Sequence, residues 1–199
     1  MKRGRPERSR GYRPRVFDKR EPGPRILIVC EGEKTEPNYF RAFRVFSAEI
    51  VGEGYNTLSL VERAKELRDA DGPYDQVWCV FDRDAFAPED FNAAIDAALR
   101  AGMHVAYSNE AFELWYCLHF AYITSGLTRD AYRLKLTSLL GLAYRKNDSS
   151  IYGRIMHLQA DATRNARLLL QQYKDESPSD RNPSTTVHLL VDELNRWAH

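Results

Sequence analysis

The sequence predicts an α/β protein with a parallel sheet of about four strands flanked by helices, and three observations support this fold class. Apolar runs without polar alternation occur at residues 26–30 (ILIVC) and 76–81 (QVWCVF), as is typical of strands covered on both faces. Segments with helical spacing of apolar residues follow these runs. Turn signals such as Asp71-Gly72-Pro73 mark boundaries. Successive strand–helix units favour parallel pairing with right-handed crossovers.

Four strand–helix units can be placed in residues 24–121. Thr35 is a candidate cap for the first helix, and Asn56 or Thr57 caps the second. Helical spacing predicts that the second and third helices bury Leu58, Val61, Ala64, Leu67, Phe91, Ala94, Ile95 and Leu99. The expected strands span 25–30, 44–51, 76–81 and 104–107, and the expected helices span 35–43, 57–68, 88–100 and 111–120.

The remaining chain is expected to be helical, with no strand after residue 121. A long helix over 151–173 would bury Met156 and Leu158, among others, and Ser184 would cap the last helix. The predicted organisation is a basic, disordered arm (1–23), an α/β core (24–121) and an α-helical appendage packed on that core (122–199). The expected elements of the appendage are helices at 129–139, 151–173 and 185–197, with loops at 144–150 and 175–183.

Bulk composition limits the class of protein. Of the 199 residues, 43% are hydrophobic, which is enough for a substantial core. The three cysteines lie in apolar segments without a C-x-x-C pair, which favours a reducing, cytoplasmic compartment and disfavours a cysteine metal site. The N-terminus lacks the apolar core of a signal peptide, and no apolar run is long enough to span a membrane.

The charge is distributed unevenly. Residues 1–20 carry nine Lys and Arg against Glu7 and Asp18, a net charge of +7, whereas the other residues carry −6. A basic arm on an acidic body suits a nucleic-acid partner, with the arm contacting phosphates. The plainer interpretation is a solvated arm without a specific partner.

Acidic or amide side chains follow three of the predicted strands. Glu31 ends the first, Asp82 and Asp84 follow the third, and Ser108-Asn109-Glu110 follow the fourth. Ligands of open α/β sheets bind at the carboxyl ends of the strands, and clustered carboxylates repel one another unless a cation or a proton intervenes. Mg²⁺ prefers a few carboxylates together with water and phosphate oxygens. The pattern predicts a divalent-metal site acting on phosphate, with Gly32 allowing a tight turn beside it.

Four ordered motifs carry a resemblance to known proteins: ILIVCEGEKTEPNYF, VWCVFDRDAF, SNEAFELWYCLHF and NPSTTVHLLVDEL. A strand ending in Glu-Gly followed by one ending in Asp-x-Asp resembles the topoisomerase–primase (Toprim) fold. The four motifs together are similar to the RloB-like family of bacterial defence loci, over residues 25–195. This resemblance implies a Toprim-like α/β nuclease core with a C-terminal α-helical appendage, often encoded beside an ABC- or AAA-type ATPase.

The resemblance also suggests roles for individual residues. Glu31 would act as general acid or base at the scissile phosphate or as a metal ligand, Asp82 and Asp84 would bind Mg²⁺ or Mn²⁺, and Glu36 would bind or orient the metal. Lys146 would stabilise charge on the phosphate. The candidate substrate contacts are Lys34, Arg83, Asn109 and Glu113; plain surface roles remain open for Lys34 and Lys146, and a capping or solvated role for Glu113.

Two functions follow as hypotheses. The first is a metal-dependent endonuclease of anti-phage defence, which contacts DNA or RNA through phosphates that carry no base information. The second is a non-catalytic sensor subunit that docks on the ATPase through its appendage and the apolar helix at 112–120. That helix carries Trp115 and Tyr116, so a homodimer interface is also open. No P-loop is present, and Ala85-Phe86 after the Asp pair disfavours haloacid-dehalogenase chemistry. His119 lies in an apolar helix and is expected to be a core or surface histidine without a functional role.

Overall fold

The computed structural model describes residues 23–54, 57–83 and 86–198. The predicted basic arm lies outside this range except for Gly23, and so do Asn56, one of the two candidate caps of the second helix, and Asp84, one of the two predicted metal-binding aspartates.

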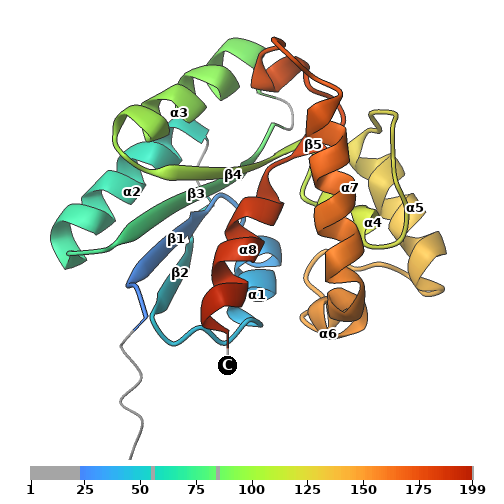
Figure 1. Cartoon of the computed structure of the whole chain (residues 1–199), viewed down its shortest axis with the longest axis horizontal. Helices are drawn as coiled ribbons and strands as arrows, with labels where there is room; N and C mark the ends of the chain where they lie inside the picture. Colours follow the sequence, from blue (N-terminus) through green and yellow to red (C-terminus); the bar gives the residue numbers. More distant parts are fainter. Residues whose placement is uncertain (1–22, 55–56, 84–85, 199) are drawn as a thin grey trace, which may run out of the picture.

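A five-stranded sheet in the order β2-β1-β3-β4-β5 forms the centre of the described chain (Figure 1). The first four strands are parallel neighbours, which confirms the predicted fold class. β5 pairs antiparallel with the end of β4 and was not expected, because two residues are too few for a strand pattern in the sequence. The strands are β1 (Ile26–Cys30), β2 (Ala48–Gly52), β3 (Gln76–Asp82), β4 (His104–Asn109) and β5 (Ser184–Thr185).

Helices cover both faces of the sheet (Figure 1). α2 and α3 lie on one face, and α1 and α8 lie on the other, with α4 to α7 beside them. The α-helices are α1 (Thr35–Arg41), α2 (Thr57–Asp71), α3 (Pro88–Arg100), α4 (Glu113–Leu118), α5 (Arg129–Leu140), α6 (Ile151–Ile155), α7 (Gln159–Gln171) and α8 (Val187–Trp197). The short 3₁₀ helices are η1 (Met156–Leu158) and η2 (Pro178–Asp180).

The alternation of side chains along the strands divides the core into two clusters. Leu27 and Val29 of β1 pack beneath α2 and α3, whereas Ile26 and Ile28 pack on the opposite side, against the remaining helices. Both sets are fully buried, which explains why the sequence of β1 shows a continuous apolar run instead of an alternating one.

Some sequence predictions about burial were wrong. Leu58 and Leu99 are exposed because the inward-facing stripes of α2 and α3 contain other residues, such as Leu60 and Phe91. The predicted long helix over 151–173 is α6, η1 and α7 in succession, and Met156 is exposed at the 3₁₀ segment.

Three element boundaries also differ from the prediction. β2 begins at Ala48 and not at residue 44, because the chain turns at Arg44, whose φ is 56°. α4 is shorter than the expected helix at 111–120. α8 begins at Val187, since Ser184 pairs in β5, and it is the Thr185 hydroxyl that accepts a hydrogen bond from the Val187 amide, at 3.2 Å.

The apolar helix α4 belongs to the core of this chain. Trp115 and Tyr116 are both essentially inaccessible to solvent and pack with α1, α5 and α7. Burial by the chain's own helices means that this helix does not present the docking face that the sensor hypothesis required. In the part of the chain that the structure describes, no helix combines the length and the apolar character needed to cross a membrane.

Candidate functional site

Glu31 extends from the end of β1 to the end of β3. Its amide donates to the Val80 carbonyl at 2.9 Å, which continues the β1–β3 ladder by one residue. Its side-chain Oε2 accepts a hydrogen bond from the Asp82 amide at 3.1 Å. The parallel register therefore places the carboxylates that end the two strands side by side, as the sequence pattern predicted.

The chain bends at residues 31–34, where a tight turn was predicted, but what requires Gly32 there is the lack of a side chain and not its backbone conformation. The φ of Gly32 is not positive; instead, a Cβ at this position would collide with the carboxylate of Glu36. Gly52, at the end of β2, makes a second close approach, because a Cβ there would lie 2.7 Å from the carbonyl oxygen of Gly32. Both glycines leave room for the loop at 31–34 to carry the Glu36 carboxylate next to β1.

Asp82 lies at the centre of a group of acids. It is 8% exposed, and its Oδ2 accepts hydrogen bonds from the Phe112 amide at 3.0 Å and from Arg129 Nη2 at 3.5 Å. Burial is the main reason why the pKa of Asp82 lies well above its ordinary value. The negative charges of Glu36, Glu113 and Glu31 raise it further, so all four carboxylates share one electrostatic environment.

Glu36 and Glu113 bring two further buried carboxylates, from α1 and α4. Burial raises the pKa of Glu36, an effect that Lys146 partly offsets, and its Oε2 has no hydrogen-bond partner among the described residues. Glu113 is 2% exposed and accepts a hydrogen bond from the Tyr144 hydroxyl at 3.2 Å. The sequence left a solvated position possible for Glu113. Its burial excludes that position.

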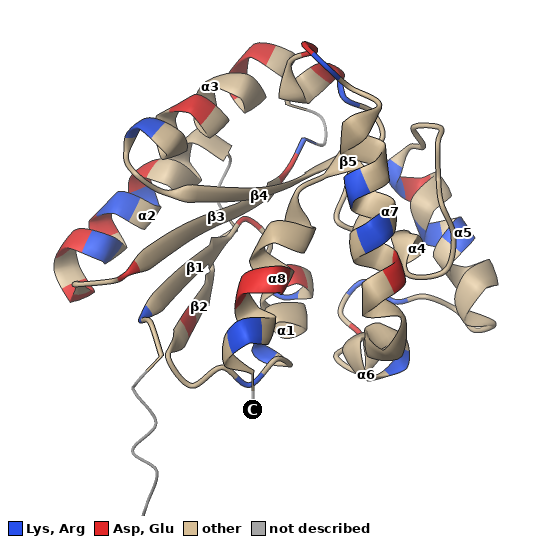
Figure 2. Ribbon diagram, in the orientation of Figure 1, with Lys and Arg blue, Asp and Glu red and all other residues tan. Residues whose placement is uncertain are grey.

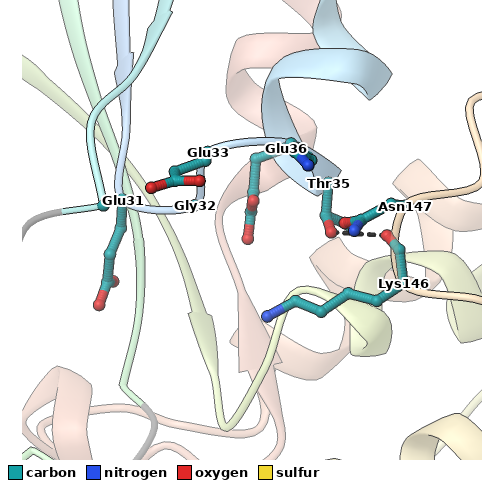
Figure 3. Close-up of a pocket in the computed structure, with 9 residues that line it drawn as sticks. Glu31, Gly32, Glu33, Thr35, Glu36, Lys146 and Asn147 are labelled. Atoms are coloured by element: carbon teal, nitrogen blue, oxygen red, sulfur yellow. Dashed lines mark hydrogen bonds between the residues drawn. The ribbon is translucent and has the colours of Figure 1, made fainter.

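Lys146 reaches the carboxylates from the loop at 142–150. In Figure 3 its side chain extends from the loop toward the carboxylate of Glu36. The loop is held by the Thr35 hydroxyl, which donates to the Lys146 carbonyl oxygen at 2.7 Å. The sequence predicted that the Thr35 side chain caps α1. This prediction was wrong, because the Thr35 hydroxyl binds the loop instead.

Two adjoining cavities open on these side chains. One, of about 340 Å³, is lined by Glu31, Lys34, Glu36 and Lys146, among others. The second, of about 210 Å³, shares Glu31, Glu36 and Lys146 with the first and adds Asp82 and Arg129. The two cavities thus combine four carboxylates (Glu31, Glu33, Glu36 and Asp82) with three cations (Lys34, Arg129 and Lys146) at the carboxyl edge of the sheet.

The structure does not bring every predicted contact into this site. Asn109 is fully buried, and its Nδ2 donates to the carbonyl oxygens of Pro178 and Ser179, at 3.3 and 2.9 Å. Arg83 lies 3.8 Å from Glu110 in an ion pair. Neither residue lines the two cavities, whereas Lys34 lines the larger one.

Two functional candidates were missed by the sequence reasoning: Arg129, which pairs with Asp82, and Tyr144, which binds Glu113. They belong to segments outside the four motifs, and only packing brings them to the acids. The sequence left a core or a surface position open for His119, and the structure places it in the core: it is 2% exposed, its Nδ1 lies 2.9 Å from the Trp115 carbonyl oxygen, and burial lowers its pKa to about 4.

The chemistry of these donors fits a divalent cation, although the described residues do not form a closed metal site. Within residues 23–54, 57–83 and 86–198, no three His, Cys, Asp or Glu side chains converge closely enough to hold a metal ion. Asp84 lies outside these ranges. Glu36 Oε2 has no partner among the described residues, and the pKa of Asp82 is raised first by burial and then by the charges of Glu36, Glu113 and Glu31. A divalent cation at these carboxylates would neutralise that charge.

These features define an α/β protein with a largely parallel sheet, whose carboxyl edge gathers buried carboxylates beside a lysine and an arginine. Residues 26–194 match the RloB-like protein family, and the chain belongs to this family. Searches of curated proteins and of solved structures gave no match.

Proposed function

We propose that this protein is a metal-dependent nuclease of the Toprim type, which hydrolyses phosphodiester bonds of DNA or RNA. The observation that carries the proposal is the group formed by Glu31, Glu36 and Asp82 with Lys146 and Arg129 around two adjoining cavities. Carboxylates for a cation, next to side-chain cations for a phosphate, are the components that metal-assisted phosphate hydrolysis requires.

Each residue would contribute in a different way. Asp82, Glu36 and Glu31 would hold Mg²⁺ or Mn²⁺, with Asp84 as a further ligand; the bound metal would polarise the phosphate and lower the pKa of water. Glu31, at the rim of the cavities, would accept or deliver a proton at the scissile phosphate. Lys146 and Arg129 would offset the negative charge that develops on the phosphate oxygens. Lys34 would contact an adjacent phosphate.

The biological setting remains a proposal that rests on family resemblance. A nuclease of this kind would act in the cytoplasm in anti-phage defence, together with an ATPase encoded nearby. No P-loop occurs in this chain, so ATP hydrolysis would come from that partner. The partner could also control when the nuclease is active.

The test is a cleavage assay with labelled DNA and total RNA in Mg²⁺, Mn²⁺ or EDTA. Cleavage is expected to need the metal and to fall roughly a hundredfold or more in Glu31→Gln and Asp82→Asn. Asp96→Asn, at an exposed position on α3, removes the same charge far from the site and is the matched control. Full activity of Glu31→Gln and Asp82→Asn would refute the assignment of the site.

Metal binding has a readout that does not depend on turnover. A ligand that binds only the folded state stabilises it, by about 1.4 kcal/mol at ten times its Kd. Mg²⁺ should therefore raise the Tm of the wild-type protein and of Asp96→Asn, but not that of Asp82→Asn. If metal binds and no nucleic acid is cleaved, the assay should be repeated with the ATPase, since the chain would then act as a partner-controlled or sensor subunit.

A further inference from the structure

A third cavity, lined mostly by charged and polar residues, lies beside the two cavities of the acidic site, at the loop that leads into α6. It has a volume of about 730 Å³ and is lined by Arg145, Lys146, Asn147, Asp148 and Arg154, together with other residues of the segment 142–150. The roles proposed above assign no function to Arg145 or Arg154. Figure 2 shows basic residues on this part of the molecule, at α6 and the loop before it.

The cavity shares lining residues with the acidic site. Lys146 and Asn147 line both this cavity and the 340 Å³ cavity, and Lys146 also lines the 210 Å³ cavity that contains Asp82. All three cavities therefore border Lys146. We call this series of neighbouring cavities, from Arg154 to the carboxylates, the path.

The charges along this path are sharply divided. The carboxylates of Glu31, Glu36 and Asp82 lie at one end. At the other end, Arg145 and Arg154 are exposed and form no ion pair with any described carboxylate within 4 Å; Arg154 Nε donates instead to the Ser150 hydroxyl, at 3.1 Å. The arginine end of the path is thus open to an anion.

Asp148 is the one acid among the described residues that line this cavity. Its Oδ1 accepts hydrogen bonds from the amide and the hydroxyl of Ser150, at 2.9 and 2.6 Å. These bonds lower the pKa of Asp148, so it stays ionised at neutral pH. One carboxylate against Arg145, Lys146 and Arg154 leaves the lining with a net charge of +2.

A cavity between α7 and α8 shows that two arginines do not by themselves make an anion site. It has a volume of about 550 Å³ and is lined by Arg164 and Arg167, among others. Arg164 lies 2.7 Å from Asp161, and Arg167 lies 2.6 Å from Asp192. These guanidinium groups form close ion pairs with carboxylates of the same chain. Arg145 and Arg154 form none within 4 Å among the described residues, although both interact electrostatically with Asp148.

We propose that Arg145 and Arg154 bind the phosphates of a nucleic-acid strand next to the phosphate held at the carboxylates. This inference rests on the proposed nuclease function and extends it by naming the path of the substrate backbone. Asn147 and Ser149, which also line the cavity, add side-chain donors of the kind that contact phosphate oxygens. Contacts of this type hold the strand without reading its bases, so the path accepts many sequences.

The docking of the loop links the two ends of the path. The Thr35 hydroxyl holds the carbonyl of Lys146, and the next residue after Thr35 is Glu36, whose carboxylate lines the acidic cavities. Phosphates bound at Arg145 and Arg154 would therefore be held at a defined position relative to the carboxylates. The basic loop serves to position the strand, and the acids carry out the reaction.

The test measures binding separately from cleavage. Fluorescence anisotropy of fluorescein-labelled single-stranded DNA and RNA of one mixed sequence is recorded in EDTA over a series of KCl concentrations. The double variant Arg145→Gln/Arg154→Gln is expected to bind roughly tenfold more weakly. The slope of log K against log salt should fall by about 0.7 for each phosphate that the variant no longer neutralises.

Two controls isolate the role of position. Arg164→Gln/Arg167→Gln makes the same change in net charge and should bind as the wild type does. Arg145→Lys/Arg154→Lys keeps the charge and should retain most of the affinity, which a merely unfolded variant would not. Equal binding by Arg145→Gln/Arg154→Gln and the wild type, or an equal decrease in affinity in the two glutamine double variants, would overturn the proposal.

The outcomes also separate this proposal from the nuclease function. Glu31→Gln should bind the labelled strands normally in EDTA and fail to cleave them with Mg²⁺. If the wild type never cleaves but its binding depends on Arg145 and Arg154, the nuclease proposal fails and the binding path stands. If the wild type cleaves and these arginines affect neither binding nor cleavage, the path is wrong and the nuclease stands.

Discussion

The two faces of the sheet are built from the same strands but differ in what they bury. Among the described residues, α2 and α3 contribute no buried Asp or Glu, and the cluster beneath them is a plain apolar core. On the other side, Glu36 of α1, Asp82 at the end of β3 and Glu113 of α4 are all less than 9% exposed. Both faces of the sheet therefore carry an apolar core, and only the face of α1 and α4 adds a group of buried carboxylates at its edge.

This difference separates the sources of stability and function. Burying a carboxylate is unfavourable unless it is paired or neutralised, whereas burying apolar area is the main stabilising contribution to folding. The raised pKa values of Asp82 and Glu36 indicate that their ionised forms are not fully compensated by the chain. A group that weakens the fold at neutral pH is best explained by a ligand or a reaction that needs it.

The largest expected change in the free energy of unfolding comes from a substitution in the apolar cluster beneath α2 and α3. Phe91 of α3 is fully buried and makes edge-to-face contacts with Phe81 and Tyr107, at ring-centroid distances of 5.7 and 5.5 Å. Phe91→Ala should lower the free energy of unfolding by about 3–5 kcal/mol, because it leaves a cavity in this cluster. The decrease, measured by urea unfolding, should be the same at pH 5 and pH 8; a strongly pH-dependent decrease would contradict the proposed division between the faces.

A smaller change in the free energy of unfolding, an increase, is expected when Asp82 on the acidic side is replaced by Asn. In the folded state the pKa of Asp82 is raised, so the native state binds more protons than the unfolded chain, and stability falls as pH rises from about 4 through the folded pKa. Asp82→Asn removes this penalty, and its carbonyl oxygen can still accept from the Phe112 amide. The variant should be more stable than the wild type at pH 8 and nearly equal to it at pH 4.

Urea unfolding across this pH range measures the effect, and Asp96→Asn on α3 serves as the control because its side chain is exposed. The control should leave the pH profile unchanged. If Asp82→Asn were less stable than the wild type at pH 8, the ion pair with Arg129 would outweigh the repulsion from the other acids, and the carboxylate group would be a stabilising feature.

The smallest expected effect concerns the hydrogen bond that joins the basic loop to the acids. Thr35→Val removes the hydrogen bond from the hydroxyl to the Lys146 carbonyl and should lower the free energy of unfolding by about 1 kcal/mol. Thr35→Ser keeps the hydroxyl and should behave as the wild type does. The cleavage rate should also fall in Thr35→Val, although most of the protein stays folded, since Lys146 lines both acidic cavities. An unchanged cleavage rate in Thr35→Val would show that cleavage does not need this hydrogen bond.

The sequence by itself determined the parallel core and the edge of the sheet at which the acids gather. Strands buried on both faces leave continuous apolar runs, and β1 and β3 are both recognised by theirs, together with the acids that end them. Because parallel strands end at the same edge, Glu31 and Asp82 could be predicted to lie together, and their hydrogen bond is in the structure. These features depend on residues close together in the chain.

Only the tertiary structure decided which other groups join that edge. Thr35 and Lys146 are 111 positions apart, and Arg129 reaches Asp82 across 47 positions, so their meeting depends on how α1, α5 and the loop before α6 pack. The two-residue strand β5 and the burial of Glu113 depend on the same packing. A local pattern encodes a strand and its end, but contacts between distant segments are set by which helix faces fit together in the core, and no single stretch of sequence contains that information.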